Sequence, residues 1–243
     1  QGAVFVETGL WMRSSWFPRD GEDWLAAASR EVIATRTKVG ICDVSTLGKI
    51  DVQGADAAEF LNRLYCNTFT TLDVGKARYG LMLREDGIAL DDGTTSRLAP
   101  DHFLMTTTTA NAARVMSHLE FCHHAHWPEL DVQYVSVTEQ WAQMAIAGPK
   151  ARATMEKIVD KVTLDDTSFP YLAARNVTIL GGMTARLFRI SFSGEHAYEL
   201  AVPADYGSLV ARALMRAGEE FGITPYGVEA LSIMRIEKGH VAG

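Results

Sequence analysis

Glu85-Asp86-Gly87-Ile88-Ala89-Leu90-Asp91-Asp92 contains a strong β-hairpin signal. Its Asp-Gly pair favours a tight turn, because such a turn needs a positive φ that glycine adopts without steric cost. Side chains alternate between the two faces of a strand, so Asp91 and Asp92 should point opposite ways, with Asp92 beside Ile88 and Leu90. A carboxylate on a buried face is costly unless it is paired or used. The alternative is that the strand ends at Leu90 and both aspartates are solvated.

The composition is that of an ordinary globular protein. The chain has 243 residues, of which 47% are hydrophobic and 22% charged. A net charge of −7 argues against nucleic acid or an anionic membrane as the main partner. No apolar run approaches the roughly 20 residues that span a bilayer, and no signal peptide is seen. The sequence therefore predicts a protein without nucleic-acid or membrane partners.

Cysteine usage and the chain ends suggest the compartment and the context. There are three widely spaced cysteines, Cys42, Cys66 and Cys122, and no CxxC pair. Neither a zinc site nor a disulfide framework is indicated, so buried reduced thiols and a cytoplasmic location are expected. The chain opens at Gln1 without methionine and stops soon after a helical pattern, which suggests a piece of a larger polypeptide.

Hydrophobic periodicity predicts an α+β fold with antiparallel sheets and packed helices. Residues 52–57 (Val-Gln-Gly-Ala-Asp-Ala) resemble residues 146–151 (Ile-Ala-Gly-Pro-Lys-Ala), and both read as a strand, a glycine and a helix start. The simplest interpretation is two related modules, residues 1–50 plus 136–243 and residues 51–135 with the hairpin; the alternative is that two similar short motifs arose by chance. Helices are expected at 22–38, 55–64, 111–121, 204–220 and 226–238; strands are expected at 49–52, 79–83, 88–97, 102–108, 185–192 and 197–202.

Outside the hairpin, only a few polar side chains are candidates for a catalytic or binding role. Cys122-His123-His124-Ala125-His126 looks metal-like, but it follows a predicted helix and reads as a solvated loop, so no metal site is expected. Phosphate-binding glycine motifs are absent. Glu199 lies between Tyr198 and Leu200 on a strand, and it faces either solvent or a cavity. Its carboxylate could take two parallel hydrogen bonds from an amidine-like ring edge. Arg235 lies on the last predicted helix, where it is either a solvated side chain or part of a binding site.

Several segments resemble, in order, the glycine-cleavage T-protein (aminomethyltransferase) family. The matching stretches are Cys42-Asp43-Val44-Ser45 with Gly48, Gly87 to Asp92, Ala147 to Ala151, Phe192 to Leu200 and Arg235 to Gly239. Each match alone is weak, but five in family order across residues 30–240 are specific. The opening Gly9 to Arg19 and the run Thr106 to Asn111 resemble the carboxy-terminal folate domain of heterotetrameric sarcosine oxidase α subunits.

The resemblance implies a three-lobed fold around a channel that binds tetrahydrofolate, with the closing barrel lobe missing from this sequence. Asp92 matches the essential acidic residue near folate N10, which makes it the expected catalytic group. Glu199 matches the acidic residue that grips the pterin ring. Tyr79 matches a tyrosine that lines the channel. Arg235, in the "RLE-G" motif, joins these residues as an expected folate contact.

Three positions depart from the family pattern. Thr108 falls where many members have asparagine, and Phe192 falls where many have tyrosine. Ser96 replaces a further tyrosine that lines the pocket in glycine-cleavage members. Thr108 and Phe192 remain expected folate-binding positions with altered contacts, and the departures argue against an ordinary glycine-cleavage T-protein.

The activity that the resemblance implies is tetrahydrofolate-dependent one-carbon transfer within a sarcosine oxidase. In flavin-linked relatives another site oxidises sarcosine or a related amine to an imine, and tetrahydrofolate captures its one-carbon unit as 5,10-methylenetetrahydrofolate. Folate, the amine-derived imine and a flavoprotein subunit would be the partners, with flavin and NAD bound elsewhere in the assembly. The alternatives are a glycine-cleavage-type aminomethyltransferase, a folate-dependent demethylase, and a folate-binding or structural module without catalysis.

Overall fold

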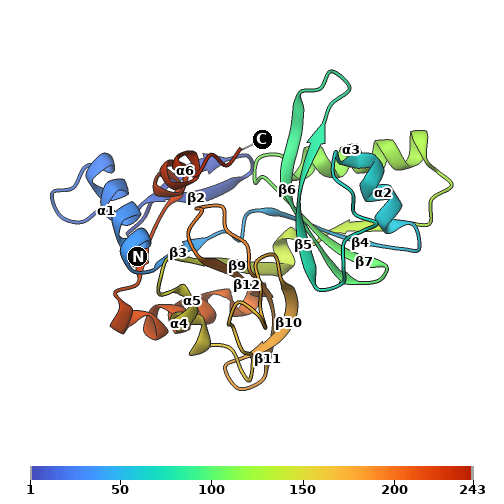
Figure 1. Ribbon diagram of the computed structural model, residues 1–243. Coiled ribbons are helices and arrows are strands. Elements are labelled where there is room, and N and C mark those ends of the chain that lie inside the picture. Colours follow the sequence, from blue (N-terminus) through green and yellow to red (C-terminus); the bar gives the residue numbers. More distant parts are fainter. Residues whose placement is uncertain (1, 242–243) are drawn as a thin grey trace. The chain divides into compact units, whose positions relative to one another are not determined.

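The computed structural model describes residues 2–241, which form two compact units (Figure 1). Unit 1 comprises residues 2–45, 140–171 and 176–241, and unit 2 comprises residues 46–139 and 172–175. Each unit is a mainly antiparallel sheet with packed helices, so the expected α+β class is confirmed. As a statement about domains, the division into 1–50 plus 136–243 and 51–135 stays a prediction.

Unit 1 is built on a six-stranded sheet. The strand order is β10 (Ala174–Ile179), β11 (Met183–Phe188), β12 (Ala197–Pro203), β9 (Trp141–Ala147), β3 (Gly40–Asp43) and β13 (Thr224–Pro225). Strands β11, β12, β9 and β3 pair antiparallel, and β13 lies parallel to β3. The helices of this unit are α1 (Trp24–Thr37), α4 (Ala151–Glu156), α5 (Gly207–Ala217) and α6 (Val228–Glu237), with short 3₁₀ turns at Ala204–Tyr206 and Glu219–Phe221.

A buried glutamate on α1 ties two loops of unit 1 to this helix. Glu31 has no exposed surface, and its carboxylate accepts hydrogen bonds from the backbone N–H groups of Phe17 (2.7 Å) and Gly227 (2.8 Å). Burial raises the pKa of Glu31, while these two N–H donors act in the opposite direction. The side chain therefore acts as a structural staple rather than as a solvated helix residue.

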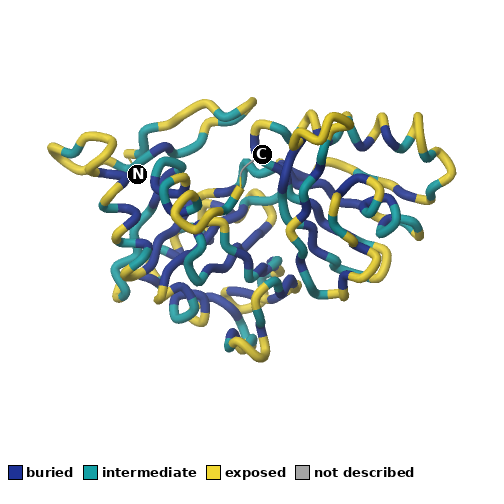
Figure 2. Tube along the Cα trace, turned by 45° about the horizontal axis from the view of Figure 1, so that its top comes forward, coloured by how far each residue is buried: buried dark blue, intermediate teal, exposed yellow. Residues whose placement is uncertain are grey.

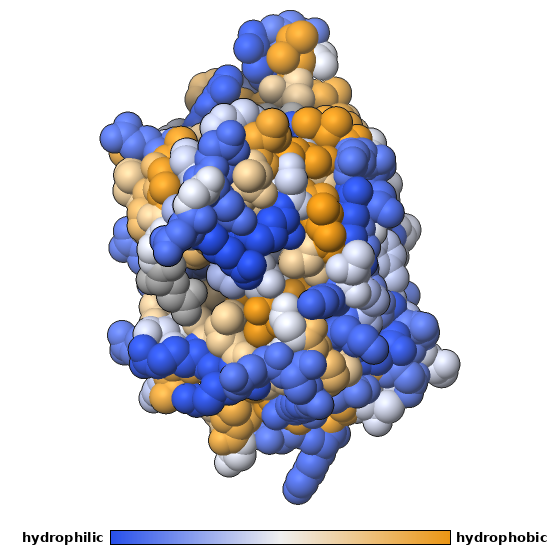
Figure 3. Space-filling model, turned by 90° about the vertical axis from the view of Figure 1, so that its left-hand side faces the viewer, coloured by the Kyte–Doolittle hydropathy of each residue, from blue (hydrophilic) through white to orange (hydrophobic). Residues whose placement is uncertain are grey.

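A two-stranded ribbon formed by β1 (Val4–Thr8) and β2 (Trp11–Trp16) belongs to unit 1 as well. Strand β2 packs against α6, while Phe5, Leu10 and Met12 of the ribbon are exposed. Figure 3 views the molecule from the left of Figure 1 and shows apolar groups exposed among polar ones on that face. Single exposed apolar residues are common on protein surfaces.

Unit 2 is a five-stranded antiparallel sheet with two helices. The strand order is β5 (Lys76–Leu83), β6 (Ala89–Ala99), β7 (His102–Thr107), β4 (Gly48–Gln53) and β8 (Gln133–Ser136). Helices α2 (Ala57–Leu64) and α3 (Ala112–His126) bury Phe60, Leu61 and Leu119 in one cluster with Ile50 and Met105 of the sheet. A 3₁₀ turn at Thr138–Gln140 ends the segment. In Figure 2 the buried segments lie within the sheets and the exposed ones gather in loops.

The hairpin differs from strict alternation by one residue. Met82 pairs with Asp91 but Leu83 pairs with Ala89, so Leu90 is the extra residue of a β-bulge. Leu90 packs in the same core cluster as Met82, whereas Asp92 lies on the other face of the sheet. The expectation that Asp92 shares a face with Ile88 and Leu90 was therefore wrong. The alternative of solvated aspartates was also wrong, because β6 continues to Ala99 and both carboxylates are buried.

Helix and strand ends show further differences. Helix α3 runs on to His126, so the Cys122–His126 cluster is helical and not a loop. Cys122 is buried because it continues the apolar stripe of Val115 and Leu119. The strand expected at 185–192 ends at Phe188, and the helix expected at 204–220 is broken into α5 and the two 3₁₀ turns.

The two similar sequence segments have the same local geometry. Gly54 (φ +136°) and Gly148 (φ +120°) each follow a strand and precede a helix. The N–H of Ala57 bonds to the carbonyl of Gly54, and the N–H of Ala151 bonds to the carbonyl of Gly148, at 3.1 and 3.0 Å. The internal repeat is therefore present in the backbone as well as in the sequence.

No helix among residues 2–241 combines the length and apolarity needed to cross a bilayer.

Candidate functional site

Asp92 is a buried carboxylate paired with a tyrosine in unit 2. It is 7% exposed, and its Oδ2 accepts a hydrogen bond of 3.0 Å from the hydroxyl of Tyr79 on the neighbouring strand β5. Burial and the charge of Asp92 raise the pKa of Tyr79 to about 12. Tyr79 therefore stays protonated at neutral pH and remains a donor to the carboxylate.

Asp91 has a different set of partners. It is 2% exposed and accepts hydrogen bonds from Thr108 Oγ1 (2.5 Å), from Thr108 N (3.3 Å) and from Asn111 Nδ2 (3.2 Å). Burial raises the pKa of Asp91, against the lowering effect of these donors. Asp91 thus anchors the connection between β7 and α3, and the two adjacent aspartates act on opposite faces of β6.

The face of the unit 2 sheet that carries Asp92 is polar. Thr94 lies two residues beyond Asp92, and its hydroxyl bonds to that of Thr106 at 3.0 Å. Lys49 pairs with Thr106 across β4 and β7 and has no exposed surface; its Nζ donates to the carbonyl of Leu47 at 3.0 Å. Buried polar side chains on one sheet face mark it as a candidate for function rather than for packing.

Glu199 is the corresponding buried carboxylate of unit 1. Its neighbours Tyr198 and Leu200 are fully buried in the core, and Glu199, 7% exposed, lies on the opposite face of β12. Its Oε2 accepts a hydrogen bond from Nε2 of Gln143 on β9. Of the two environments left open by the sequence, solvent is therefore the wrong one.

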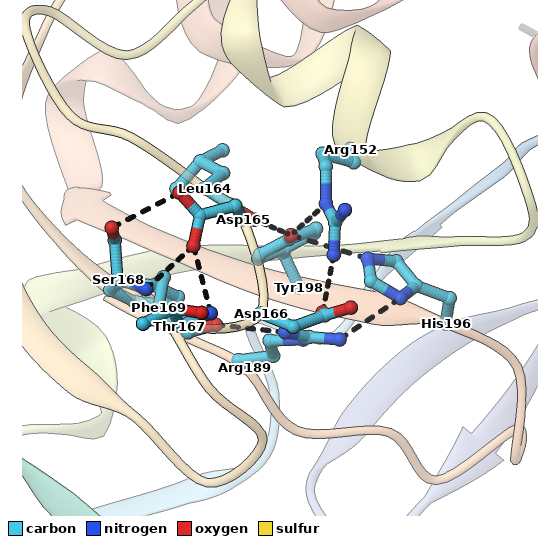
Figure 4. A network of polar contacts seen from close by, with 10 residues as sticks. All are labelled: Arg152, Leu164, Asp165, Asp166, Thr167, Ser168, Phe169, Arg189, His196 and Tyr198. Carbon is cyan, nitrogen blue, oxygen red and sulfur yellow. Dashed lines mark hydrogen bonds and ion pairs between the residues drawn. The ribbon is translucent and has the colours of Figure 1, made fainter.

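A polar network supports β12 from its core-facing side (Figure 4). The hydroxyl of Tyr198 donates to the carbonyl of Leu164 (3.2 Å) and contacts Nε2 of His196 (3.2 Å). Asp166 bridges the guanidinium groups of Arg152 and Arg189. These contacts attach the segment after α4 to the sheet and fix the strand on which Glu199 lies.

Phe192 and Arg235 meet at a third residue, His240. The ring centroids of Phe192 and His240 are 6.1 Å apart, and the two residues share a 2.8 Å hydrogen bond between His240 Nδ1 and the Phe192 carbonyl. Arg235 Nη1 donates to the carbonyl of His240 at 3.2 Å. Arg235 is therefore half-buried and bonded to backbone, not a solvated helix residue.

The structure groups the expected site residues in part. It joins Tyr79 with Asp92, and Phe192 with Arg235 through His240. Thr108 bonds to Asp91 instead of Asp92. Sequence reasoning missed Gln143, although an amide within the apolar strand Trp141–Ala147 was a usable signal. No set of three His, Cys, Asp or Glu within residues 2–241 could hold a metal ion.

Comparison with known proteins identifies the family of this chain. A family model described as the GCVT N-terminal domain matches residues 1–242. The chain belongs to the GCVT N-terminal domain family. A solved structure, glycine cleavage system aminomethyltransferase T from Bartonella henselae, superposes with a TM-score of 0.82 at 23% identity, over 99% of this chain and 60% of that one. The aminomethyltransferase-like fold is thus shown for this GCVT domain.

Two curated relatives of this GCVT domain carry names that describe an activity. The sarcosine oxidase subunit alpha of Rhizobium meliloti (strain 1021) is 65% identical over 99% of this chain, which spans 24% of that relative. The aminomethyltransferase of Anoxybacillus flavithermus (strain DSM 21510 / WK1) is 30% identical over 97% of this chain, which spans 60% of that relative. The chain thus corresponds to about a quarter of the first relative and three fifths of the second.

Proposed function

We propose that this chain is the tetrahydrofolate-dependent one-carbon-transfer domain of a sarcosine oxidase α subunit. The observation that carries the proposal is a pair of buried, hydrogen-bonded carboxylates, Asp92 and Glu199, at the two family positions for folate chemistry. The 65% identity to a sarcosine oxidase α subunit, against 30% to an aminomethyltransferase, favours the oxidase over glycine cleavage.

Asp92 is the proposed catalytic group. Overall, bound tetrahydrofolate would offer two nitrogens to the methylene carbon of the amine-derived imine, the bond from this carbon to the amine would break, and the departing amine would take up the two protons that the folate nitrogens lose. The first new C–N bond forms as one folate nitrogen loses its proton. Asp92 accepts that proton or stabilises the cationic carbon, a contribution of about 10²–10⁴-fold in rate. Tyr79, which remains protonated, holds the carboxylate by its 3.0 Å hydrogen bond. Holding the two reactants together supplies a further part of the acceleration.

Glu199 is the proposed pterin-binding residue. A carboxylate accepts two parallel hydrogen bonds from a ring N–H and an adjacent amino group, which is the edge that a pterin presents. The side-chain amide of Gln143 donates to the Glu199 carboxylate, and its oxygen places a further hydrogen-bond acceptor on the same face of the sheet. The residues present therefore fit a reduced pterin. Phe192, Arg235 and Thr108 are proposed as further folate contacts.

The wider assembly belongs to the same proposal. The imine must come from oxidation of an amine. This sequence has no glycine-rich motif for binding the dinucleotide cofactor of such an oxidation. A flavoprotein subunit is the proposed source, with flavin and NAD bound in other parts of the assembly, in a cytoplasmic location.

The proposal is tested by binding and by product formation. Anaerobic titration of the protein with tetrahydrofolate should give saturable binding that Glu199→Gln weakens at least about tenfold, because one acceptor of the paired edge becomes a donor. Arg212→Gln, an exposed change on α5, is the matched control. Equal affinities for wild type and Glu199→Gln would refute the pterin role; binding without 5,10-methylenetetrahydrofolate formation in the complete oxidase would indicate a non-catalytic folate module.

A further inference from the structure

Glu199 stands at one end of a row of side chains that crosses three strands. Glu199 pairs with Ala145, and Ala145 pairs with Cys42, so the three side chains lie side by side on one face of the sheet. Adjacent strands are about 4.8 Å apart, which places the Cα atoms of Glu199 and Cys42 about 9.6 Å apart. Ala145 between them carries only a methyl group. The row therefore has a carboxylate at one end and a thiol at the other, and the small side chain of Ala145 leaves space between them.

Gln143 presents an acceptor to this row. It lies two residues before Ala145 on β9, hence on the same face, and is 1% exposed. Its amide nitrogen must face the Glu199 carboxylate, because two oxygens would repel one another. Oε1 therefore points away from Glu199, and no described residue donates a hydrogen bond to it. Ser45 bonds to the backbone of Gln143 and fixes the strand at this point.

Arg13 presents donors near the other end. Its Nε and Nη2 atoms are buried, and no described group accepts a hydrogen bond from either. Arg13 and Glu199 both act electrostatically on the Cys42 thiol, whose pKa burial raises to about 12. Arg13 lies on β2, and the next two residues of this strand, Ser14 and Ser15, approach the backbone of Gly227. The neighbouring Tyr226 donates its N–H to the carbonyl of Ile41 on β3, so the strand of Arg13 lies beside the Cys42 end of the row. Buried polar atoms without partners are uncommon in proteins, and they call for an explanation.

We infer that Gln143 and Arg13 are specificity-determining residues that read the 2-amino and 4-oxo groups of the pterin. The inference rests on the proposed function. Gln143 Oε1 accepts the amino hydrogen that Glu199 leaves unused, and Arg13 donates to the 4-oxo oxygen. The three side chains thus present acceptors beside the amino edge and a donor beside the carbonyl. A ligand that lacks either group leaves a buried polar atom unpaired, which is how a site rejects a close analogue.

The Arg13 part is tested with two ligands that differ at one position. Wild type should bind tetrahydrofolate at least about tenfold tighter than tetrahydroaminopterin, in which a 4-amino donor replaces the 4-oxo acceptor and ring N3 no longer carries the proton offered to Glu199. Arg13→Met should remove the part of this preference that comes from the 4-position and lower the ratio several-fold, whereas Arg212→Met on the surface of α5 should retain the full ratio. A damaged fold would weaken the binding of both ligands and lower the unfolding temperature. An unchanged ratio in an Arg13→Met variant that unfolds at the wild-type temperature overturns the assignment of Arg13.

The Gln143 part uses the tetrahydro form of 2-desamino-2-methylfolate as the second ligand. Wild type should prefer tetrahydrofolate, and Gln143→Leu should lower this preference at least about tenfold. A wild-type preference that persists in Gln143→Leu overturns the assignment of Gln143. Wild type that binds neither ligand refutes the proposed function itself, so the two failures are distinguishable. Thermal unfolding of each variant verifies that the protein titrated is folded.

Discussion

Asp91 and Asp92 are adjacent but have different roles, and Asp91→Ala tests the structural role of Asp91. The substitution leaves the Thr108 N–H and hydroxyl and one Asn111 amide hydrogen without their acceptor. A hydrogen bond to a charged group contributes about 1.5–3 kcal/mol, and a donor left unsatisfied costs about 1–3 kcal/mol. Release of a buried carboxylate offsets part of this, so the expected net loss is about 2–4 kcal/mol.

Urea unfolding measures this loss as a fall in midpoint at constant m-value. Asp73→Ala, at an exposed position at the start of the same unit's β5 hairpin, should change stability by less than about 0.5 kcal/mol. Thr108→Val combined with Asp91→Ala should be less destabilising than the sum of the single changes, by about 1 kcal/mol. Strict additivity, or a loss no larger than that of Asp73→Ala, would refute the anchoring role of Asp91.

Three further predictions concern stability. Because burial raises the pKa of Asp91, its contribution to stability is complete below its ordinary value near 3.8 and is lost as pH rises through the folded-state pKa; the advantage of wild type over Asp91→Asn in urea titrations should therefore shrink as pH rises above about 4, and a difference that stays constant with pH contradicts this. Glu31→Ala leaves the buried N–H of Gly227 and the part-buried N–H of Phe17 without their acceptor and should cost about 2–4 kcal/mol, whereas a loss below about 0.5 kcal/mol in urea would exclude this structural role. Gly148→Ala places a Cβ 2.2 Å from the carbonyl oxygen of Thr35 and should cost about 2–4 kcal/mol in thermal or urea unfolding, against about 1 kcal/mol for Gly181→Ala in open space; equal losses would contradict the close approach.

Much of the fold could be predicted because the hydrophobic period is regular where packing is regular. Tyr198 and Leu200 alternate with Glu199, and the structure buries the first two in the core. The period failed at Leu90, because a bulge adds one residue and resets which face the next side chain takes. The end of α3 was placed too early, although Trp127 before Pro128 marks the boundary that the structure has.

The site was predictable in its charged groups and not in their partners. A carboxylate in an apolar strand signals a buried role, as Glu199 illustrates. The bond between Thr108 and Asp91 depends on the bulge, which local sequence does not reveal. Gln143 was overlooked because an amide carries no charge, although its place within an apolar strand was a signal of the same kind.

Production of 5,10-methylenetetrahydrofolate by the complete oxidase with Asp92→Asn is the most direct test of the central claim. The substitution preserves the shape of the side chain and removes its ability to take a proton. The account predicts that the rate of folate product falls by about 10²–10⁴-fold, while sarcosine oxidation at the flavin continues. Folate product formed at the wild-type rate by Asp92→Asn would contradict the assignment of this carboxylate as the catalytic group.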